Sequence, residues 1–324
     1  MKFLAVEGLG QVSRIGLGTW QFGSKEWGYG DDYAAGTAID IVRRALELGV
    51  TLFDTAEVYS SGKSERILAR ALGSSRESVV VASKILPIAP FPPIVLRHEA
   101  ASADRLQLKK IPLYQVHQAN PVIPDSVTMR GMRTLLDTDR IGAVGVSNYS
   151  LARWRKADTA LGQPVVSNQV QFSLAHAGPL KHLVPFAERE NRMIIAYSPL
   201  AQGLLGGRYT VTNRPGGVRR FSPLFGRENL RRVQPLLDTL REVADAHHVK
   251  PAQVALAWLL TLPQVVVIPG ASSVEQLEFN VAASDLELEP DSVSALSAAA
   301  AAFDPVSAAR TLFDAARQSR PLGS

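Results

Sequence analysis

Short apolar stretches recur along the chain, and most of them stop abruptly at a polar residue. They are rich in β-branched residues, which is typical of buried strands. Segments with apolar residues at helical spacing lie between them, as at 38–49, 64–73 and 125–139. The pattern therefore predicts strands at 14–18, 50–54, 79–83, 113–117, 142–146, 165–170, 193–197 and 265–268.

Eight strands that alternate with helices predict an α/β fold, a closed parallel (β/α)8 TIM barrel preceded by an N-terminal hairpin. Gly49 and Gly73 stand where two of the helices would end. Barrels commonly reach the length of this chain, so we expect residues 1–318 to form a single domain. The Ala-rich stretch 290–318 predicts accessory helices outside the barrel, and residues 319–324 a disordered tail.

The interval 203–250 is long for a connection between a strand and a helix, and its first half is dense in Gly, Pro and Arg. Long segments of this kind in compact domains are usually functional or mobile. The arginines within 219–232 allow two interpretations. They belong either to a solvated loop that runs into a helix or to a lid over an anionic ligand.

Composition narrows the possible classes. The chain of 324 residues has no cysteine, which excludes disulfides, thiolate nucleophiles and cysteine-ligated metal sites, and we expect no metal site. No stretch approaches the roughly 18 to 20 apolar residues of a membrane span, so a cytoplasmic protein without a membrane partner is predicted. The net charge of +5 favours anionic ligands such as phosphorylated cofactors and does not indicate nucleic acid. Nothing in the sequence indicates an oligomeric state.

Four polar residues stand at or just after predicted strand ends: Asp54, Tyr59, Lys84 and His117. In a barrel, the carboxyl ends of the strands face one mouth, where active sites form. Taken singly, each residue has a structural explanation as a cap, a packing aromatic, an exposed charge or a core histidine. The four together favour catalysis.

The chemistry of these four groups suits a carbonyl. A tyrosine has a pKa near 10 and needs a nearby cation to act as an acid, which Lys84 can supply. Asp54 can keep the ammonium charged and oriented, and His117 can hydrogen-bond the carbonyl oxygen. This set predicts carbonyl reduction in which the phenol delivers a proton.

Several segments in order give the chain a resemblance to the aldo-keto reductase superfamily over about residues 3–300. The resemblance implies that Asp54, Tyr59, Lys84 and His117 are the catalytic tetrad, with Tyr59 as proton donor. The SPLAQG segment resembles the bacterial, channel-subunit-like branch. The segments are GLGTWQFG (16–23), FDTAEVYSSGKSE (53–65), VASK (81–84), LYQVH (113–117), IGAVGVSNYS (141–150), AYSPLAQGLLGGRY (196–209) and VIPGASSVEQLEFN (267–280).

No GxGxxG motif follows a strand, so a Rossmann cofactor site is not indicated. The resemblance instead implies NADP(H) lying across the barrel mouth. By that resemblance Ser147, Asn148 and Gln169 hold the nicotinamide carboxamide, and Tyr197 stacks on its ring. The remaining implied cofactor residues are Trp20 at the mouth, Ser198, Leu200, Gln202, Gly203 and Arg208 along the pyrophosphate, and Pro269, Gly270, Ala271, Ser272, Gln276 and Asn280 around the adenosine.

Two of these positions depart from the family pattern. Many NADP-using members carry Arg or Lys where this chain has Ser272, and often Arg where it has Gln276. The direct ionic partner of a 2′-phosphate is then missing. NADP(H) stays the expected cofactor, NAD(H) is the alternative, and Arg208 or an arginine from 214–232 is the candidate replacement.

Aromatic residues on the predicted mouth loops indicate a mostly apolar substrate pocket. The expected substrate is a small aldehyde, ketone or sugar-like carbonyl, or the corresponding alcohol. The candidate substrate-binding residues are Trp20, Trp27, Tyr29, Phe91 and His117.

Two alternatives to a reductase stay open at this point. A nucleotide-sensing regulatory subunit would keep the fold and cofactor with little turnover, but would have no need of Lys84 or Asp54. A cofactor-free lyase would use Lys84 as a Schiff-base amine and would leave Tyr59 without a purpose.

Overall fold

The computed structural model describes residues 1–23 and 36–306. Eight parallel strands form one curled sheet in the order in which they follow each other along the chain. The last strand returns to the first segment, where the Gly16 amide donates to the Val267 carbonyl at 2.8 Å and the Val267 amide donates to Arg14 at 2.9 Å. The predicted α/β barrel is confirmed. Its strands are β3 (Leu17–Gly18), β4 (Leu52–Asp54), β5 (Val80–Ile85), β6 (Ile111–Val116), β7 (Ile141–Ser147), β8 (Ser167–Gln171), β9 (Met193–Tyr197) and β10 (Val265–Val267).

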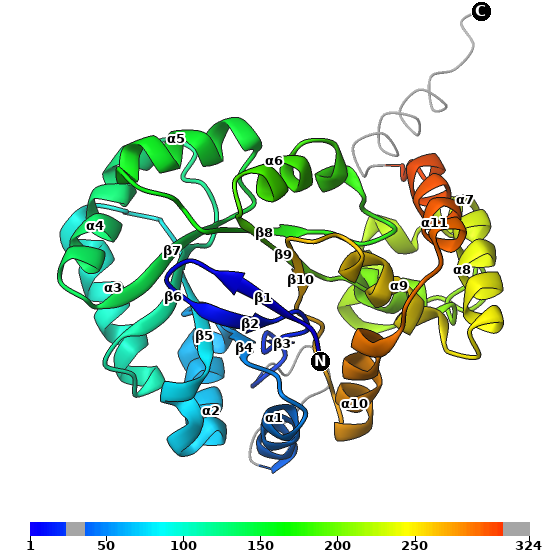
Figure 1. The fold of residues 1–324 in the computed structure, drawn as a ribbon, viewed down its shortest axis with the longest axis horizontal. Helices are drawn as coiled ribbons and strands as arrows, with labels where there is room; N and C mark the ends of the chain where they lie inside the picture. Colours follow the sequence, from blue (N-terminus) through cyan, green and yellow to red (C-terminus); the bar gives the residue numbers. More distant parts are fainter. Residues whose placement is uncertain (24–35, 307–324) are drawn as a thin grey trace, which may run out of the picture.

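Helices surround the strands (Figure 1). The predicted helical segments are present, and Gly49 and Gly73 follow two of them with positive φ values of 80° and 55°. A glycine tolerates that conformation without a steric penalty, so it ends a helix well. The helices are α1 (Ala38–Glu47), α2 (Lys63–Leu72), α3 (Pro92–Leu106), α4 (Asp125–Asp137), α5 (Leu151–Leu161), α6 (Leu183–Arg189), α7 (Arg227–Arg232), α8 (Gln234–Ala246), α9 (Pro251–Leu260), α10 (Val274–Ala282) and α11 (Pro290–Ala302).

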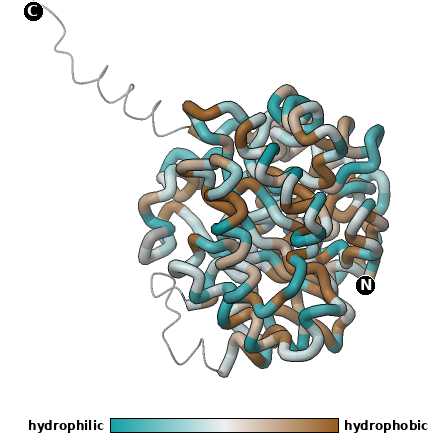
Figure 2. Tube along the Cα trace, turned by 90° about the vertical axis from the view of Figure 1, so that its left-hand side faces the viewer, coloured by the Kyte–Doolittle hydropathy of each residue, from teal (hydrophilic) through white to brown (hydrophobic). Residues whose placement is uncertain are grey.

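The hydrophobic core has two parts. One lies between the strands and the surrounding helices, and the other fills the interior of the barrel with residues such as Leu52, Leu113 and Ile195. Hydrophobic stretches accordingly run through the body of the trace in Figure 2. The predicted N-terminal hairpin consists of β1 (Phe3–Val6) and β2 (Gly10–Ser13), and its Val6 and Val12 join the interior cluster. The hairpin thus plugs the barrel at the end opposite the carboxyl ends of the strands.

The segment after β9 is only partly irregular. It contains short 3-10 turns at Ala201–Gly206, Gly217–Phe221 and Pro223–Phe225 before α7 and α8 begin. Helix α11 packs outside the barrel against α8, in agreement with the prediction for the Ala-rich region.

Some sequence predictions fall on residues 24–35 and 307–324, outside the described part of the chain. These are the substrate roles of Trp27 and Tyr29 and the disordered tail. Within residues 1–23 and 36–306, no helix has the length and apolarity to cross a membrane. The same residues contain no cluster of His, Cys, Asp and Glu that could hold a metal ion.

Candidate active site

The barrel interior changes from apolar to polar one layer below the mouth. Side chains two residues apart on a strand point to the same face. Leu52 and Leu113 fill the interior, and the residues two positions later on their strands are Asp54 and Gln115. On β5, Ala82 lies in the apolar interior and Lys84, two residues later, points to the same face and joins the polar layer. The strand pattern therefore delivers a buried polar layer to the floor of the mouth.

Lys84 is the centre of this layer. Its Nζ donates to Asp54 Oδ1 at 2.7 Å, to the Thr55 carbonyl at 2.8 Å and to the Tyr59 hydroxyl at 3.1 Å. The Lys84 side chain is 0 % exposed and that of Asp54 is 3 % exposed. All three donor positions of the ammonium thus have partners, which is the condition for keeping such a charge inside a protein.

The environment moves the pKa values of these groups. Burial acts to lower the pKa of Lys84, but Asp54 and Tyr59 outweigh it, so that pKa is raised and the ammonium stays protonated. Burial raises the pKa of Tyr59, Lys84 opposes this increase and Asp54 adds to it. The phenol therefore holds its proton at neutral pH, while the adjacent cation can stabilise the phenolate that would remain after proton transfer.

Asp54 is held in place by amides as well as by the ammonium. Gln169 Nε2 donates to Oδ2 at 2.7 Å, and Gln115 Nε2 lies 3.5 Å from the same oxygen. A Cβ on Gly145 would lie 2.4 Å from the Ser167 hydroxyl and 2.9 Å from Gln115 Cγ, so a larger residue there would push against this floor. Gln169 therefore supports the carboxylate, a contact that the sequence did not indicate.

His117 follows β6 and lies beside Tyr59. Their ring centroids are 5.7 Å apart in an edge-to-face arrangement. Burial, and next to it the positive charge of Lys84, lower the pKa of His117 to about 4. The imidazole is therefore neutral at pH 7 and can donate one ring N–H to an acceptor in the cavity.

The loop that carries Tyr59 is fastened to the end of β5. The Glu57 amide donates to the Lys84 carbonyl at 3.3 Å, and the Glu57 carboxylate accepts from the Leu86 amide at 2.7 Å. Its second oxygen lies 2.8 Å from His98 Nδ1 on α3. Glu57 thereby fixes the spacing between Tyr59 and Lys84, which lie on different segments.

A cavity of about 740 Å³ opens above this floor. Asp54, Tyr59 and His117 line it, while Lys84 lies beneath them. Most of the predicted cofactor residues also line it, so the structure brings together groups from seven of the eight strand ends and the connections that follow them. Those residues are Trp20, Ser147, Asn148, Gln169, Tyr197, Ser198, Leu200, Gln202, Gly203, Arg208, Pro269, Gly270, Ala271, Ser272 and Gln276.

Polar contacts order one wall of the cavity. The Tyr197 hydroxyl donates to Asn148 Oδ1 at 3.0 Å, and the Ser147 hydroxyl donates to the Gln169 carbonyl at 2.9 Å. Asn148 and Ser198 have positive φ values of 59° and 50°, which non-glycine residues rarely adopt. Such backbone strain concentrates at functional sites.

The opposite end of the cavity lies at the start of α10. The Ser272 amide and hydroxyl both donate to Gln276 Oε1, each at 2.7 Å. Two arginines, Arg208 and Arg219, line the cavity, and Arg208 Nη2 donates to the Tyr209 hydroxyl at 2.7 Å. Of the two interpretations of 219–232, the cavity position of Arg219 favours cover over an anionic ligand.

The arginines later in the same segment behave differently. Arg231 and Arg232 pair with Glu228 on the surface of α7. They therefore match the solvated interpretation.

Besides Lys84, which lies beneath the floor, two described residues of the predicted site do not line the cavity. Asn280 is buried on α10 and donates to the Gly270 carbonyl at 3.3 Å, so it supports the loop from behind. Phe91 precedes α3 with 51 % of its surface exposed, and its proposed contact with substrate stays a prediction.

The sequence reasoning missed several residues of the cavity wall. Gln171 had a usable signal, because it lies two residues after Gln169 on β8 and so shares its face. Gln21 follows Trp20 and donates to the Ala271 carbonyl at 3.1 Å, a contact between segments 250 residues apart. The missed wall residues are Gly18, Gln21, Val58, Gln171, Pro199 and Ile268, while Arg219 belongs to the segment 214–232 from which an arginine was expected.

A parallel α/β barrel with a lysine, an aspartate, a tyrosine and a histidine at its mouth is the arrangement of a barrel oxidoreductase. The model of the Aldo/keto reductase family matches residues 14–301. The chain therefore belongs to the aldo/keto reductase family, as its sequence resemblance predicted.

Known proteins of the family resemble the chain over nearly its full length. An "uncharacterized oxidoreductase" of Mycobacterium tuberculosis is 70 % identical over 318 residues, which are 98 % of each chain. The structure of a glycerol dehydrogenase from Gluconobacter oxydans aligns with a TM-score of 0.84 and 25 % identity, covering 94 % of this chain and 98 % of the other. An aldo-keto reductase from Klebsiella pneumoniae in complex with NADPH aligns with a TM-score of 0.75 and 27 % identity, covering 94 % and 96 %.

Proposed function

We propose that the protein reduces an aldehyde or ketone to the alcohol, or catalyses the reverse oxidation, with a nicotinamide cofactor and with Tyr59 as the proton donor. One observation carries this proposal. The Lys84 ammonium touches both Asp54 and the Tyr59 hydroxyl at a buried position directly below a cavity. A nucleotide-sensing subunit would need neither contact.

In the direction of reduction, a bound nicotinamide cofactor would supply the hydride that the carbonyl carbon takes up. The Tyr59 hydroxyl gives its proton to the carbonyl oxygen, and Lys84 stabilises the phenolate that remains. Asp54 keeps the ammonium oriented. Neutral His117 donates a hydrogen bond that aligns the carbonyl, and solvent then returns a proton to Tyr59.

The cavity wall fits a nicotinamide cofactor by its chemistry. Asn148 and Gln169 carry amides suited to a carboxamide, and the Tyr197 ring offers a surface for stacking. Gly203, with a φ of 92°, lets backbone come close to a pyrophosphate. We assign the segments 198–203 and 269–272 to the phosphates and adenosine.

We propose NADP(H) as the cofactor, with NAD(H) as the alternative. Arg208 and Arg219 provide positive charge in the cavity, and among the described residues that line it the only carboxylate, Asp54, is already paired with Lys84. The Klebsiella pneumoniae relative was solved with NADPH. Dissociation constants of both cofactors, measured by quenching of tryptophan fluorescence, distinguish the two, and tighter binding of NADH would overturn the choice.

Tyr59→Phe tests the catalytic assignment. The variant removes the proton and leaves the ring, so turnover should fall by about 100- to 10,000-fold while the dissociation constant of the cofactor stays the same. The assay follows nicotinamide absorbance with a panel of aldehydes, ketones and alcohols. Unchanged turnover would refute the role of Tyr59, and tight cofactor binding without turnover on any substrate would favour the sensor.

The panel also addresses the substrate, which we propose to be a small carbonyl compound or alcohol. The membership of the channel-subunit-like branch and a cytoplasmic location stay predictions from the sequence.

A further inference from the structure

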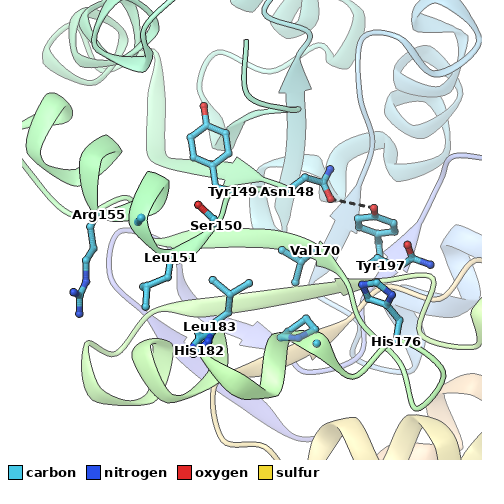
Figure 3. A pocket seen from close by; sticks show the side chains of 14 residues that line it. Asn148, Tyr149, Ser150, Leu151, Arg155, Val170, His176, His182, Leu183 and Tyr197 are labelled. Atoms are coloured by element: carbon cyan, nitrogen blue, oxygen red, sulfur yellow. Dashed lines mark hydrogen bonds between the residues drawn. The ribbon is translucent and has the colours of Figure 1, made fainter. Parts of the chain in front are cut away.

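A second cavity of about 750 Å³ lies beside the active site, between the start of α5 and the turn before α6 (Figure 3). We call it the α5–α6 cavity. None of the four catalytic residues lines it. Its volume lies within the range of sites for small organic ligands.

The two cavities share a wall. Asn148 and Tyr197, joined by their hydrogen bond, line both of them. Figure 3 shows this pair at one side of the α5–α6 cavity, with Arg155 and Leu151 at the other side. A ligand in the α5–α6 cavity would thus lie behind the proposed nicotinamide wall rather than over the catalytic groups.

Arg155 gives the lining of the α5–α6 cavity a positive charge. Among the fourteen lining residues in the described part of the chain there is no Asp or Glu, whereas Arg155, His176 and His182 all belong to the lining. The Arg155 guanidinium packs over the Phe186 ring at 5.2 Å and forms no ion pair within the described ranges 1–23 and 36–306. Its charge is therefore available to a ligand.

Other residues of the lining offer hydrogen-bond donors, and Figure 3 shows His176 on the Tyr197 side of the cavity, away from Arg155. The first turn of α5 contributes Leu151 and Ala152, whose amides have no acceptor within the helix. Burial lowers the pKa of His176, so its imidazole offers an N–H rather than a charge at neutral pH. These groups can bind an acceptor, and none of them repels an anion.

The rest of the lining is apolar. Leu151, Val170 and Leu183 lie between Arg155 and the Tyr197 ring in Figure 3, and Pro179 also lines the cavity. Val170 is 6 % exposed, so this part of the wall is fixed on a barrel strand. A ligand that matches both parts has a compact apolar body and one negative end.

We propose that the α5–α6 cavity binds a small aromatic or alicyclic carboxylate, with the carboxylate on Arg155 and the ring against Leu151, Val170 and Leu183. An arginine fork matches a carboxylate with two parallel hydrogen bonds. The ligand and the cofactor bind to opposite sides of the Tyr197–Asn148 pair, so the protein can hold both of them at the same time.

Calorimetric titration of the full chain with 1-naphthoate tests the proposal, with 1-naphthamide as the uncharged analogue. Naphthoate should bind with a dissociation constant below about 1 mM and about tenfold more tightly than the amide. Arg155→Gln should remove this preference. Binding should persist at saturating NADPH and in Tyr59→Phe.

Arg189→Gln is the matched control. Arg189 also packs over the Phe186 ring, 5.8 Å from its centroid, and does not line the cavity. This variant should keep the preference for the carboxylate. Equal loss in both arginine variants, displacement of naphthoate by NADPH, or equal binding of acid and amide would each overturn the proposal.

Discussion

The contact between Lys84 and Asp54 can be tested by a double-mutant cycle. Lys84→Met keeps an unbranched chain of similar length and removes the charge, and Asp54→Asn keeps the shape of the carboxylate. In wild type the two groups are 2.7 Å apart with side-chain exposures of 0 % and 3 %. Each single variant therefore leaves one buried charge without its counter-charge.

The expected magnitudes follow from this geometry. At 2.7 Å and an effective dielectric constant of about 20, the direct attraction is about 6 kcal/mol, most of which offsets the desolvation of both groups. Breaking such a pair from one side costs about 3 to 5 kcal/mol. The double variant contains neither buried charge, so it should be no less stable than either single variant. The coupling energy between Lys84 and Asp54 should then be at least about 2 kcal/mol.

Urea unfolding at pH 7, followed by the fluorescence of the four tryptophans, measures the cycle. The control is the surface pair Arg133 and Asp137, whose charged atoms are 2.8 Å apart but whose side chains are 45 % and 55 % exposed. Its coupling should be about 0.5 kcal/mol or less. If the Lys84–Asp54 coupling is no larger than this, the buried pair does not organise the site as we argue.

Three further predictions concern the groups around the pair. The pKa of His117 is about 4 in the folded state against an ordinary 6.5, so the unfolded chain binds more protons between these two values. The free energy of unfolding should therefore fall by up to about 3 kcal/mol as the pH drops through this window. His117→Asn should flatten this pH dependence in urea titrations. Glu57→Ala should lower kcat about 10- to 100-fold with little change in cofactor affinity, because it frees the Tyr59 loop. Glu57→Gln keeps an acceptor for the Leu86 amide and should retain most of kcat. Equal losses of kcat in both variants, measured in steady-state assays, would contradict a positioning role for Glu57. Gln169→Leu removes the 2.7 Å bond to Asp54 and should cost about 1 to 3 kcal/mol of stability, and an unchanged urea midpoint would argue against this support.

The polar residues at the strand ends were predictable because they are encoded locally. A segment such as VTLFD predicts a strand by its apolar residues and the end of that strand by its aspartate. Because side chains alternate between the two faces of a strand, Leu52 and Asp54 then lie on the same face. The same reasoning placed Lys84 at the end of β5 and His117 just after β6. The count of eight strands predicted a barrel, and the barrel predicted that these side chains meet at one mouth.

Contacts between distant loops were not predictable from these patterns. The resemblance assigned Gln169 to the cofactor carboxamide, and no pattern indicated that it also donates to Asp54, which lies 115 residues away along the chain. Arg219 reaches the cavity from an irregular segment in which no periodicity distinguishes it from its neighbours. Glu57 meets His98 because α3 packs beside β5, and neither residue marks the other in the sequence.

The sequence by itself determined the alternation of strands and helices, the barrel that follows from it, and the four reactive groups at one rim. Only the tertiary structure decided which groups touch. Burial set the neutral state of His117 and the protonated state of Lys84, because desolvation and neighbouring charge exist only after distant segments pack together. The same packing produced the shared Tyr197–Asn148 wall and, behind it, a cavity whose described lining residues include a cation and no carboxylate.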